Sequence, residues 1–405
     1  MRNKYLRLIS FVAVLFAAGT LCAQTTIKIV KAAGTGKESV SLDELRSVGA
    51  SADLFKQVLK QDLDRSGWFT VASGSYISIR VAGTASGQGN MLTTNIRVQW
   101  PAGSFIWAES TQTPRDVRWQ AHRLSDRIVK SIKGVDGIAS TRIAFVGKTG
   151  LRGGGIYLCD YDGANAVQLT NEQISPLSPY FDPTGQFIFY TSFDKGFPCV
   201  FRVPAAGGRR SPYANFTGLN TGGAVSPDGK YIAIILSHVG NPELFVLNLG
   251  DRKVYRQTKT PRASEASPCW SPSGSQIAYV TDVTGTPQVY VVDSNTHASK
   301  RISFRGSQNV APSWGPDGRI AYCSKQSGYQ IVVYDPKTGS EEVITQGTDY
   351  EDPSWAPDGR HIICSRKDGP SSYSLYILDT EDKSSVRLSL PSGNWHAPDW
   401  SRSVQ

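Results

Sequence analysis

From about residue 140 to its end, the chain alternates short apolar runs with turns rich in Pro, Asp and Gly. One copy of this pattern is the stretch 311–322, which reads Ala-Pro-Ser-Trp, Gly-Pro-Asp-Gly, Arg-Ile-Ala-Tyr. In the central tetrapeptide Pro presets φ, Asp hydrogen-bonds its own backbone and Gly accepts a positive φ, which together make a tight turn. The pattern therefore predicts a strand that ends at the Trp, a turn, and a second strand that starts at the Ile.

This unit recurs at a nearly constant step. The turn prolines stand at positions 183, 227, 272, 316 and 357, so the steps are 44, 45, 44 and 41 residues. A third apolar run follows, as in 288–293, and then a short fourth, as in 300–303. Four strands in roughly 40–45 residues is the period of a β-propeller blade. The repeats therefore predict a mainly β fold built from blades.

The number of blades can be counted from the second strands, which start near residues 143, 188, 232, 277, 320 and 362. The first has no Trp-ending strand before it, whereas the last Trp-ending strand, 397–400, has no second strand after it. Trp400 lies 45 residues beyond Trp355 and so keeps the period. We therefore expect the C-terminal strand to pair with 142–146 and to close a six-bladed propeller over residues 138–405, which removes the open sheet edges.

Residues 24–137 do not repeat, and they predict a smaller N-terminal α/β domain. Two stretches have apolar residues at helical spacing. One helix is expected to begin at Ser51 as its N-cap and to stop at Gly67, and the other to begin at Asp116 and to end at Gly134. Strands are expected at 26–30, 68–71, 76–81, 92–100 and 104–109, with a Gly-containing loop after the first and a turn or flexible loop at 84–90.

Residues 1–23 have the features of a secretory signal peptide. Three basic residues precede an apolar run at 9–18 that is too short to span a bilayer, and a small residue, Ala23, stands at the expected cleavage point. The alternative is a lipoprotein signal acylated at Cys22, but Leu21 stands where a small residue is expected. No later stretch is apolar enough for a membrane helix. We therefore expect cleavage and export.

The net charge and the cysteine positions exclude few classes of function. Loss of the three basic residues of the signal lowers the net charge from +9 to +6, and the remaining Lys and Arg occur in runs no longer than two. Dispersed basic residues are typical of a solvated surface and not of a nucleic-acid groove. The five cysteines after the signal lie in or beside strand patterns, which favours buried apolar packing.

The chain shows no motif for catalysis, a cofactor or a metal. It has no Gly-x-Ser-x-Gly elbow, no His-Glu-x-x-His helix and no phosphate-binding Gly loop, and its five histidines share no metal-ligand spacing. Asp228, Asp317 and Asp358 resemble a carboxylate series, but they occupy the repeated turn, where Asp is favoured for local hydrogen bonds. We therefore predict no catalytic, cofactor-binding or metal-binding residues, while a cation in the propeller channel stays an open alternative.

What the sequence offers instead is a binding surface at one end of the channel. We call this end the mouth, and define it by the loops that lead from the outer strand of one blade to the inner strand of the next. These loops are 171–177, 214–222, 260–266, 305–310, 346–351 and 391–396. They carry polar and aromatic residues, namely Phe216, Leu219, Asn220, Glu265, Arg305, Asn309, Tyr350 and Trp395. Such residues on loops over a rigid frame are usual in recognition surfaces, although each alone can equally be an ordinary solvated residue.

The junction and the repeats also carry a family resemblance. The junction reads Gly137-Ile-Ala-Ser-Thr-Arg-Ile-Ala-Phe-Val146, and one repeat contains Arg301-Ile-Ser-Phe-Arg-Gly-Ser-Gln-Asn309. Together with the signal peptide, the α/β domain and the six repeats, these stretches resemble the TolB family of Tol–Pal system proteins over nearly the whole mature chain.

This resemblance implies a periplasmic adaptor that is not an enzyme and has no cofactor. The mouth would bind the peptidoglycan-associated outer-membrane lipoprotein Pal, and the first mature residues would bind the inner-membrane-anchored protein TolA, so that the outer membrane follows constriction at division. The implied Pal contacts are Leu219, Asn220, Gly222, Glu265 and Ala266, and the implied TolA contacts are Thr25, Ile27 and Ile29. Arg305, Asn309, Tyr350 and Trp395 complete the predicted partner-binding set.

A different class of function stays open beside this one. An exported propeller enzyme or carbohydrate-binding protein would use the central channel itself. In either case we expect a monomer with no membrane span and no nucleic-acid partner.

Overall fold

The computed structural model describes residues 36–74, 76–87, 89, 91–111, 114–148 and 154–402. Lys37–Gln405 forms one compact unit. The predicted signal peptide, the predicted strand 26–30 and the predicted contact residues Thr25, Ile27 and Ile29 lie outside the described residues. Among the helices that are described, none is both long and apolar enough to cross a membrane.

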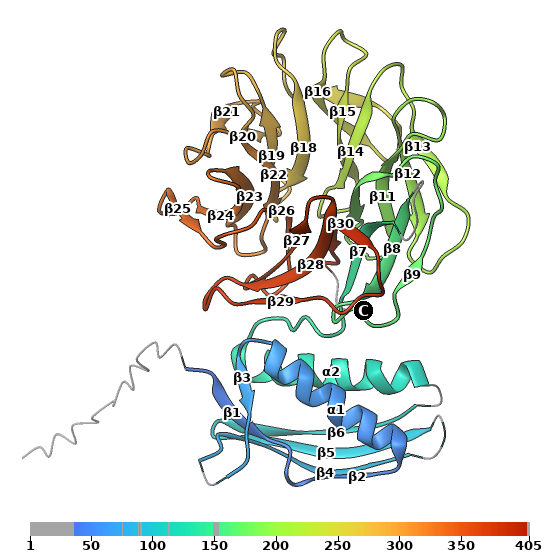
Figure 1. Cartoon of the computed structure of the whole chain (residues 1–405), viewed down its shortest axis with the longest axis vertical. Coiled ribbons are helices and arrows are strands. Elements are labelled where there is room, and N and C mark those ends of the chain that lie inside the picture. The colour runs from blue at the N-terminus through green and yellow to red at the C-terminus, as the bar shows by residue number, and fades with distance from the viewer. Residues whose placement is uncertain are drawn as a thin grey trace, which may run out of the picture. The chain divides into compact units, whose positions relative to one another are not determined.

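The N-terminal part is a mixed sheet with two helices on one face (Figure 1). Its elements are β1 Glu38–Ser41, β2 Leu45–Val48, α1 Ala50–Arg65, β3 Phe69–Val71, β4 Ile79–Ser86, β5 Leu92–Trp100, β6 Gly103–Thr111 and α2 Pro114–Lys133. The strand order is β3-β1-β4-β5-β6, and β2 also pairs with β4. Buried and exposed residues alternate along β5, so Leu92, Ile96 and Val98 share one core with Phe55 of α1 and Leu124 of α2.

Both predicted helices are present, but both begin before the predicted residue. α1 begins at Ala50, directly after Gly49, so Ser51 lies inside the helix. The Ser51 hydroxyl donates to the carbonyl of Gly89 at 2.6 Å instead of capping the helix. α2 begins at Pro114, which places Asp116 inside its first turn. Proline is favoured in the first turn of a helix because it has no N–H to leave unpaired. At the start of α2 this preference of Pro114 outweighs the preference of Asp116 for the N-cap position.

The helix ends and most strands agree with the predictions, and the exceptions have a common cause. Gly67 and Gly134 follow the two helices with φ of 72° and 76°. However, β1 and β2 lie in the stretch predicted as a loop, and β4 continues to Ser86 through the predicted turn. β1 and β2 pair in parallel with strands that come later in the chain. Such pairing is set by distant partners, and short polar strands carry little local signal for it.

The rest of the chain is a propeller of six four-stranded antiparallel sheets, as predicted (Figure 1). The first three blades in chain order are β10 Leu177–Phe181, β11 Phe187–Ser192, β12 Cys199–Pro204, β13 Ser211–Ala214; β14 Asn220–Val225, β15 Tyr231–Leu236, β16 Glu243–Asn248, β17 Val254–Arg256; and β18 Glu265–Trp270, β19 Gln276–Thr281, β20 Gln288–Asp293, β21 Ser299–Arg301. The next two are β22 Asn309–Trp314, β23 Ile320–Lys325, β24 Tyr329–Asp335, β25 Ser340–Val343; and β26 Tyr350–Trp355, β27 His361–Gly369, β28 Ser372–Asp379, β29 Ser385–Arg387. The sixth combines β30 Asn394–Trp400 with β7 Arg142–Lys148, β8 Gly155–Asp160 and β9 Val167–Gln168.

The predicted closure of the ring is confirmed. β30 pairs antiparallel with β7, with Trp400 opposite Ile143 and His396 opposite Val146. The Trp400 side chain is 1% exposed, and its Nε1 donates to the hydroxyl of Thr141 at 2.6 Å. The last strand of the chain is thus the inner strand of the blade that the first propeller strand begins.

Every inner strand carries a bulge at the same place. The register shifts once in each pairing of an inner strand with its neighbour. The equivalent residue of each bulge has a positive φ, namely Ser178, Gly222, Ser267, Ala311, Asp352 and Ala397, and in β14 the next residue, Gly223, has one as well. In five of the six a proline follows, which has no N–H to lose from the ladder. The repeated X-Pro step in the sequence therefore marks the bulge.

The two parts meet at the end of the propeller opposite the mouth. Asp126 of α2 accepts hydrogen bonds from the backbone N–H groups of Ala139 and Ser140, both at 2.8 Å, and so fixes the connecting segment. The Arg360 guanidinium lies 4.6 Å from the ring centroid of Trp68. The predicted domain boundary at 137/138 lies within this fixed connection.

Candidate functional site

The central channel is lined by residues from all six inner strands. The cavity that they leave has a volume of about 100 Å³. Pockets for small-molecule ligands usually measure roughly 300–1,000 Å³. The channel therefore has room for several waters, but it is smaller than a site for a sugar or a peptide.

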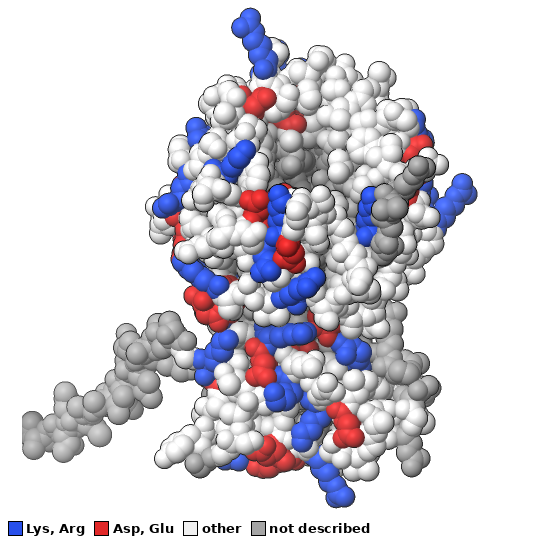
Figure 2. Space-filling view, viewed as in Figure 1, with Lys and Arg blue, Asp and Glu red and all other residues white. Residues whose placement is uncertain are grey.

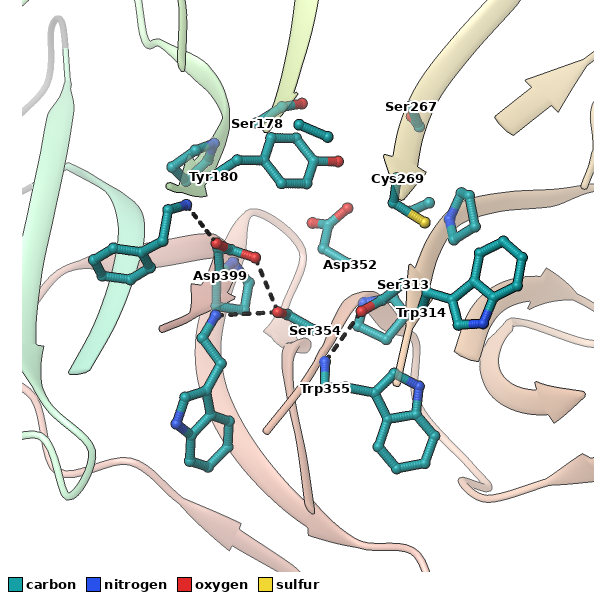
Figure 3. A pocket seen from close by; sticks show the side chains of 18 of the residues that line it. Ser178, Tyr180, Ser267, Cys269, Ser313, Trp314, Asp352, Ser354, Trp355 and Asp399 are labelled. Carbon is teal, nitrogen blue, oxygen red and sulfur yellow. Dashed lines mark hydrogen bonds between the residues drawn. The ribbon is translucent and has the colours of Figure 1, made fainter. Parts of the chain in front are cut away.

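Polar groups that face the channel connect neighbouring blades. The Ser313 hydroxyl accepts a hydrogen bond from the backbone N–H of Trp355 at 3.1 Å, and Ser354 accepts from Trp400 at 3.0 Å (Figure 3). At the closure, Asp399 takes the same role and accepts from the backbone N–H of Phe181 at 2.8 Å. These side chains therefore have a structural role in holding the ring together.

Two carboxyl groups nevertheless face this cavity. In Figure 3, Asp352 lies between Tyr180, Cys269 and Asp399. Burial raises the pKa of Asp399 to about 6 and also raises the pKa of Asp352 above its usual value. Among the described residues, the only set of three His, Cys, Asp or Glu side chains spaced for a metal lies elsewhere.

The structure places nine predicted contact residues at the mouth, and it buries six of them. Only Leu219 and Arg305 lie in loops, because the inner strands begin earlier than the predicted loops end. The buried six are Asn220, Gly222, Glu265, Asn309, Tyr350 and Trp395. Ala266 and Arg305 are exposed and Leu219 is half-buried, so these three offer side-chain surface to a partner.

The buried asparagines hold the mouth loops in place. Asn220 Oδ1 accepts from the backbone N–H of Phe216 at 2.7 Å, and its Nδ2 donates to the carbonyls of Phe216 and Gly218. Asn309 donates in the same way to the carbonyl of Arg305 at 2.7 Å. The Nδ2 group of each asparagine therefore holds the loop that precedes its strand.

The sequence analysis missed a second set of loop supports. Each support is the first or second residue of a third strand. Each accepts a hydrogen bond from a hydroxyl that follows the fourth strand: Glu243 from Thr258 at 2.7 Å, Gln288 from Ser303 at 3.0 Å and Gln330 from Thr345 at 2.9 Å. The three hydroxyls also accept the backbone N–H of Leu244, Val289 and Ile331, each at 2.9 Å. The sequence does contain a pattern that could have predicted these supports, because a Glu or Gln stands at the equivalent position of three successive repeats.

Glu265 belongs to a buried pair of carboxyl groups. It is 2% exposed, and Oε1 accepts from Thr260 at 2.7 Å and from Thr281 at 3.1 Å. Burial, together with the neighbouring Glu243, raises the pKa of Glu265 to about 7. Glu265 is therefore part of the frame beneath the mouth.

Exposed apolar side chains gather around the mouth. Nine large apolar residues are exposed on the described part of the propeller, and six of them lie in loops or strand starts at the mouth end: Ile174, Leu177, Phe197, Val239, Val283 and Phe304. We call these six the apolar rim. The other three, Val167, Tyr255 and Val386, lie on outer strands. The mouth end therefore carries more exposed large apolar side chains than the rest of the described propeller, which makes it the candidate surface for a protein partner.

Charges are mixed on the face shown in Figure 2. Lys and Arg there alternate with Asp and Glu, and no large area of one sign forms over the described residues of that face. This distribution agrees with the dispersed basic residues in the sequence. It gives no support to a nucleic-acid groove on that face.

A model of the TolB β-propeller domain matches residues 129–404, well over half of the chain. The chain belongs to the TolB β-propeller family. Curated TolB relatives include the Tol–Pal system protein TolB of Francisella tularensis subsp. holarctica strain OSU18, which is 29% identical over 243 residues. The TolB protein of F. tularensis subsp. tularensis strain WY96-3418 is 28% identical over 243 residues. Each match covers 56% of this chain and 55% of the relative, so the chain matches about half the length of these TolB proteins.

Solved TolB structures show the same fold. TolB from Acinetobacter baumannii superposes with a TM-score of 0.79 at 24% sequence identity, over 90% of this chain and 97% of that one. A putative TolB from Agrobacterium tumefaciens gives a TM-score of 0.50 at 19% identity, over 64% of this chain and 91% of the other. The first match extends beyond the propeller and includes the α/β part of the TolB fold.

Proposed function

We propose that this chain is a periplasmic adaptor of a Tol–Pal envelope system, and that its mouth binds a Pal-type peptidoglycan-associated outer-membrane lipoprotein. The observation that carries the proposal is the apolar rim, which gathers six exposed side chains at one end of the propeller. The loops around it are fixed by the buried hydrogen bonds of Asn220, Asn309 and Glu243. Loops that are already ordered lose little conformational entropy when a partner binds.

The second half of the proposal concerns the N-terminal segment. Ile27 and Ile29 stand two residues apart, so both point to one side of an extended strand, as does Thr25. We propose that this segment adds as an edge strand to a sheet of a TolA-type inner-membrane protein. An adaptor with both contacts would support outer-membrane constriction at division and envelope integrity. Export by a cleavable signal peptide supplies the periplasmic location, and the adaptor acts as a monomer with no catalysis and no cofactor.

The competing function is that of a propeller enzyme or carbohydrate-binding protein. Such a protein would hold its ligand in the channel. The channel volume of about 100 Å³ disfavours this function, because a single sugar ring with its hydroxyl groups needs a larger pocket. Turnover of a substrate panel by the purified chain would support it instead.

Two matched substitutions test the mouth. Val283 in the apolar rim and Val167 on the outer strand β9 are both 50% exposed, so Val→Asp adds the same charge to equally accessible sites. We expect Val283→Asp and Ala266→Arg to weaken binding of the soluble lipoprotein domain at least about tenfold, equivalent to roughly 1.4 kcal/mol, and Val167→Asp to leave it unchanged. Calorimetric titration measures all three. Equal affinity for Val283→Asp and Val167→Asp would contradict the proposal.

Leu219 is a weaker test residue than its predicted loop position suggested. Its side chain packs in part against the core that includes Ala224 and Trp270, and its backbone N–H donates to Ser237 at 2.8 Å. Substitution by Asp would therefore disturb the loop as well as any interface. Ala266 and Val283 separate binding from folding more cleanly because both are exposed.

A further inference from the structure

A buried cluster of possible metal ligands lies where α2 meets the turn between β8 and β9. His122 comes from α2, Asp160 is the last residue of β8, and Asp162 lies in the turn that follows. One ligand atom from each residue lies within 4.8 Å of the other two. All three side chains are buried, and they come from segments about 40 residues apart in the sequence.

The second observation is an unpartnered nitrogen on His122. The residue is 0% exposed, and its Nδ1 lies 2.7 Å from Oδ2 of Asp62. Its Nε2 has no hydrogen-bond partner among the described residues. Most buried polar atoms have a partner, so a buried atom without one needs an explanation. In the neutral tautomer in which Nδ1 donates to Asp62, Nε2 has the lone pair with which a histidine binds a metal.

Further contacts fix the ring and one carboxylate. Asp62 also accepts from the Tyr161 hydroxyl at 2.6 Å, and the Tyr161 ring packs edge-on against His122 with centroids 5.6 Å apart. A carboxylate bonded to the second ring nitrogen is the usual support of a metal-binding histidine. Oδ2 of Asp160 accepts from Asn165 at 2.6 Å, so one oxygen orients the carboxylate while Oδ1 remains for a ligand bond.

Two arginines also approach the cluster. Arg118 pairs with Oδ2 of Asp162, and Arg65 lies 4.0 Å from the same oxygen. These contacts orient the carboxylate of Asp162.

We propose that His122 Nε2, Asp160 and Asp162 bind one transition-metal ion, and that Zn²⁺ is the metal. One imidazole and two carboxylates suit Zn²⁺, with water as a fourth ligand, whereas Ca²⁺ and Mg²⁺ take oxygen ligands. Zinc bonds of about 2.0–2.2 Å in tetrahedral geometry put two ligands of one ion roughly 3.4 Å apart. Ligand atoms within 4.8 Å of one another therefore need to approach one another by at most roughly 1.4 Å when the ion binds.

Such an ion would join the α/β part to the propeller. His122 belongs to α2 and both aspartates belong to the sixth blade, so zinc binding would resist separation of the two parts. A ligand that binds only the folded state raises its stability in proportion to the logarithm of the ligand concentration. The predicted role is a structural link, distinct from partner binding at the opposite end.

The test uses the mature chain, stripped of metal by a chelator and then dialysed. We expect calorimetric titration with Zn²⁺ alone to give one ion per chain, and the melting temperature to rise with added Zn²⁺. His122→Gln and Asp160→Asn should each weaken binding at least tenfold. Asp62→Asn, which replaces the carboxylate beside His122 and Tyr161 but removes no metal ligand, should weaken zinc binding about 10–100-fold.

His361→Gln is the matched control. His361 is also buried near this junction and its Nδ1 lies 2.6 Å from an aspartate, Asp358, but it is not part of the three-ligand cluster. The His361→Gln chain should bind Zn²⁺ with the affinity of the wild type. Because His122→Gln could fail to fold, circular dichroism accompanies each variant and Asp160→Asn serves as the second test. A wild-type chain that takes up no Zn²⁺, or folded His122→Gln and Asp160→Asn chains that bind it with wild-type affinity, would overturn the proposal.

Discussion

Glu265 shows how burial changes the role of a single residue. In the sequence it is a charged residue of the predicted loop 260–266 and a predicted partner contact. In the structure it is 2% exposed and bonded to Thr260 and Thr281, beneath the mouth surface. Its Oε2 has no partner among the described residues, and the nearby Glu243 makes ionisation of both carboxyl groups costly.

Stability should therefore depend on pH through Glu265. Its pKa is about 7 in the folded chain, against a usual value of 4.5. Because the unfolded state loses this proton first, the folded state loses stability as pH rises from about 4.5 to about 7. Glu265→Gln keeps the shape and supplies a permanent donor toward Glu243. We expect the variant to match the wild type near pH 5 and to exceed it by roughly 1–3 kcal/mol at pH 8.

Urea denaturation at both pH values measures this difference. Glu342→Gln is the control, because Glu342 is exposed on the outer strand β25 and pairs with Lys383 at the surface. Its substitution should leave the pH dependence of stability as in the wild type. Parallel stability curves for the wild type and Glu265→Gln would contradict the assigned role of Glu265.

At the scale of elements, the inner strands carry both the ring and the mouth. Each inner strand contacts the next, and β30 contacts both β26 and β10, so the ring has no end. The bulge and the blade-to-blade hydrogen bonds recur along these strands. β30 differs from the others only in coming from the far end of the chain, which makes it the strand whose removal opens the ring.

Deletion of residues 397–405 should abolish cooperative unfolding or cause aggregation. It removes Trp400, whose loss from a core alone costs about 3–5 kcal/mol, and it breaks the bond between Asp399 and Phe181. The exposed edges of β7 and of the neighbouring blades are then open to pairing with other chains. Scanning calorimetry and light scattering measure the outcome. Deletion of 403–405 alone, beyond β30, should behave like the wild type, and an equal melting temperature for the longer deletion would disprove the closure argument.

At the scale of the whole molecule, the two proposed partner contacts use different parts of the sequence. The proposed lipoprotein contact is the apolar rim. The proposed inner-membrane contact is a segment before residue 37, which precedes the compact unit. Each contact can therefore be changed without altering the residues of the other.

Deletion of residues 24–31 should abolish binding of the TolA-type protein and leave lipoprotein affinity and the melting temperature unchanged. The deleted residues contribute Ile27 and Ile29 to the proposed added strand, whereas the cores begin at Val40. Pull-down and calorimetry with each partner measure the effect. Val283→Asp should weaken lipoprotein binding and leave binding of the TolA-type protein unchanged. A deletion variant that still binds the TolA-type protein would refute the role of the segment.

The sequence by itself determined the features that repeat or depend on neighbouring residues. The Pro-Asp-Gly turns and the period near 44 residues predicted six blades and their closure through Trp400. The helix ends at Gly67 and Gly134 were predicted because a positive φ selects glycine. In each case the residues that decide the structure are adjacent, or the same pattern occurs several times.

Only the tertiary structure decided which residues are buried and which distant residues meet. It paired β1 and β2 with later strands, covered Asn220, Glu265 and Trp395 at the mouth, and brought His122 next to Asp160 and Asp162. Burial depends on what a loop or strand packs against, and no local pattern records it. A polar residue at a strand start has the same sequence signature whether water or another blade covers it, so its role follows from the packing of the whole chain.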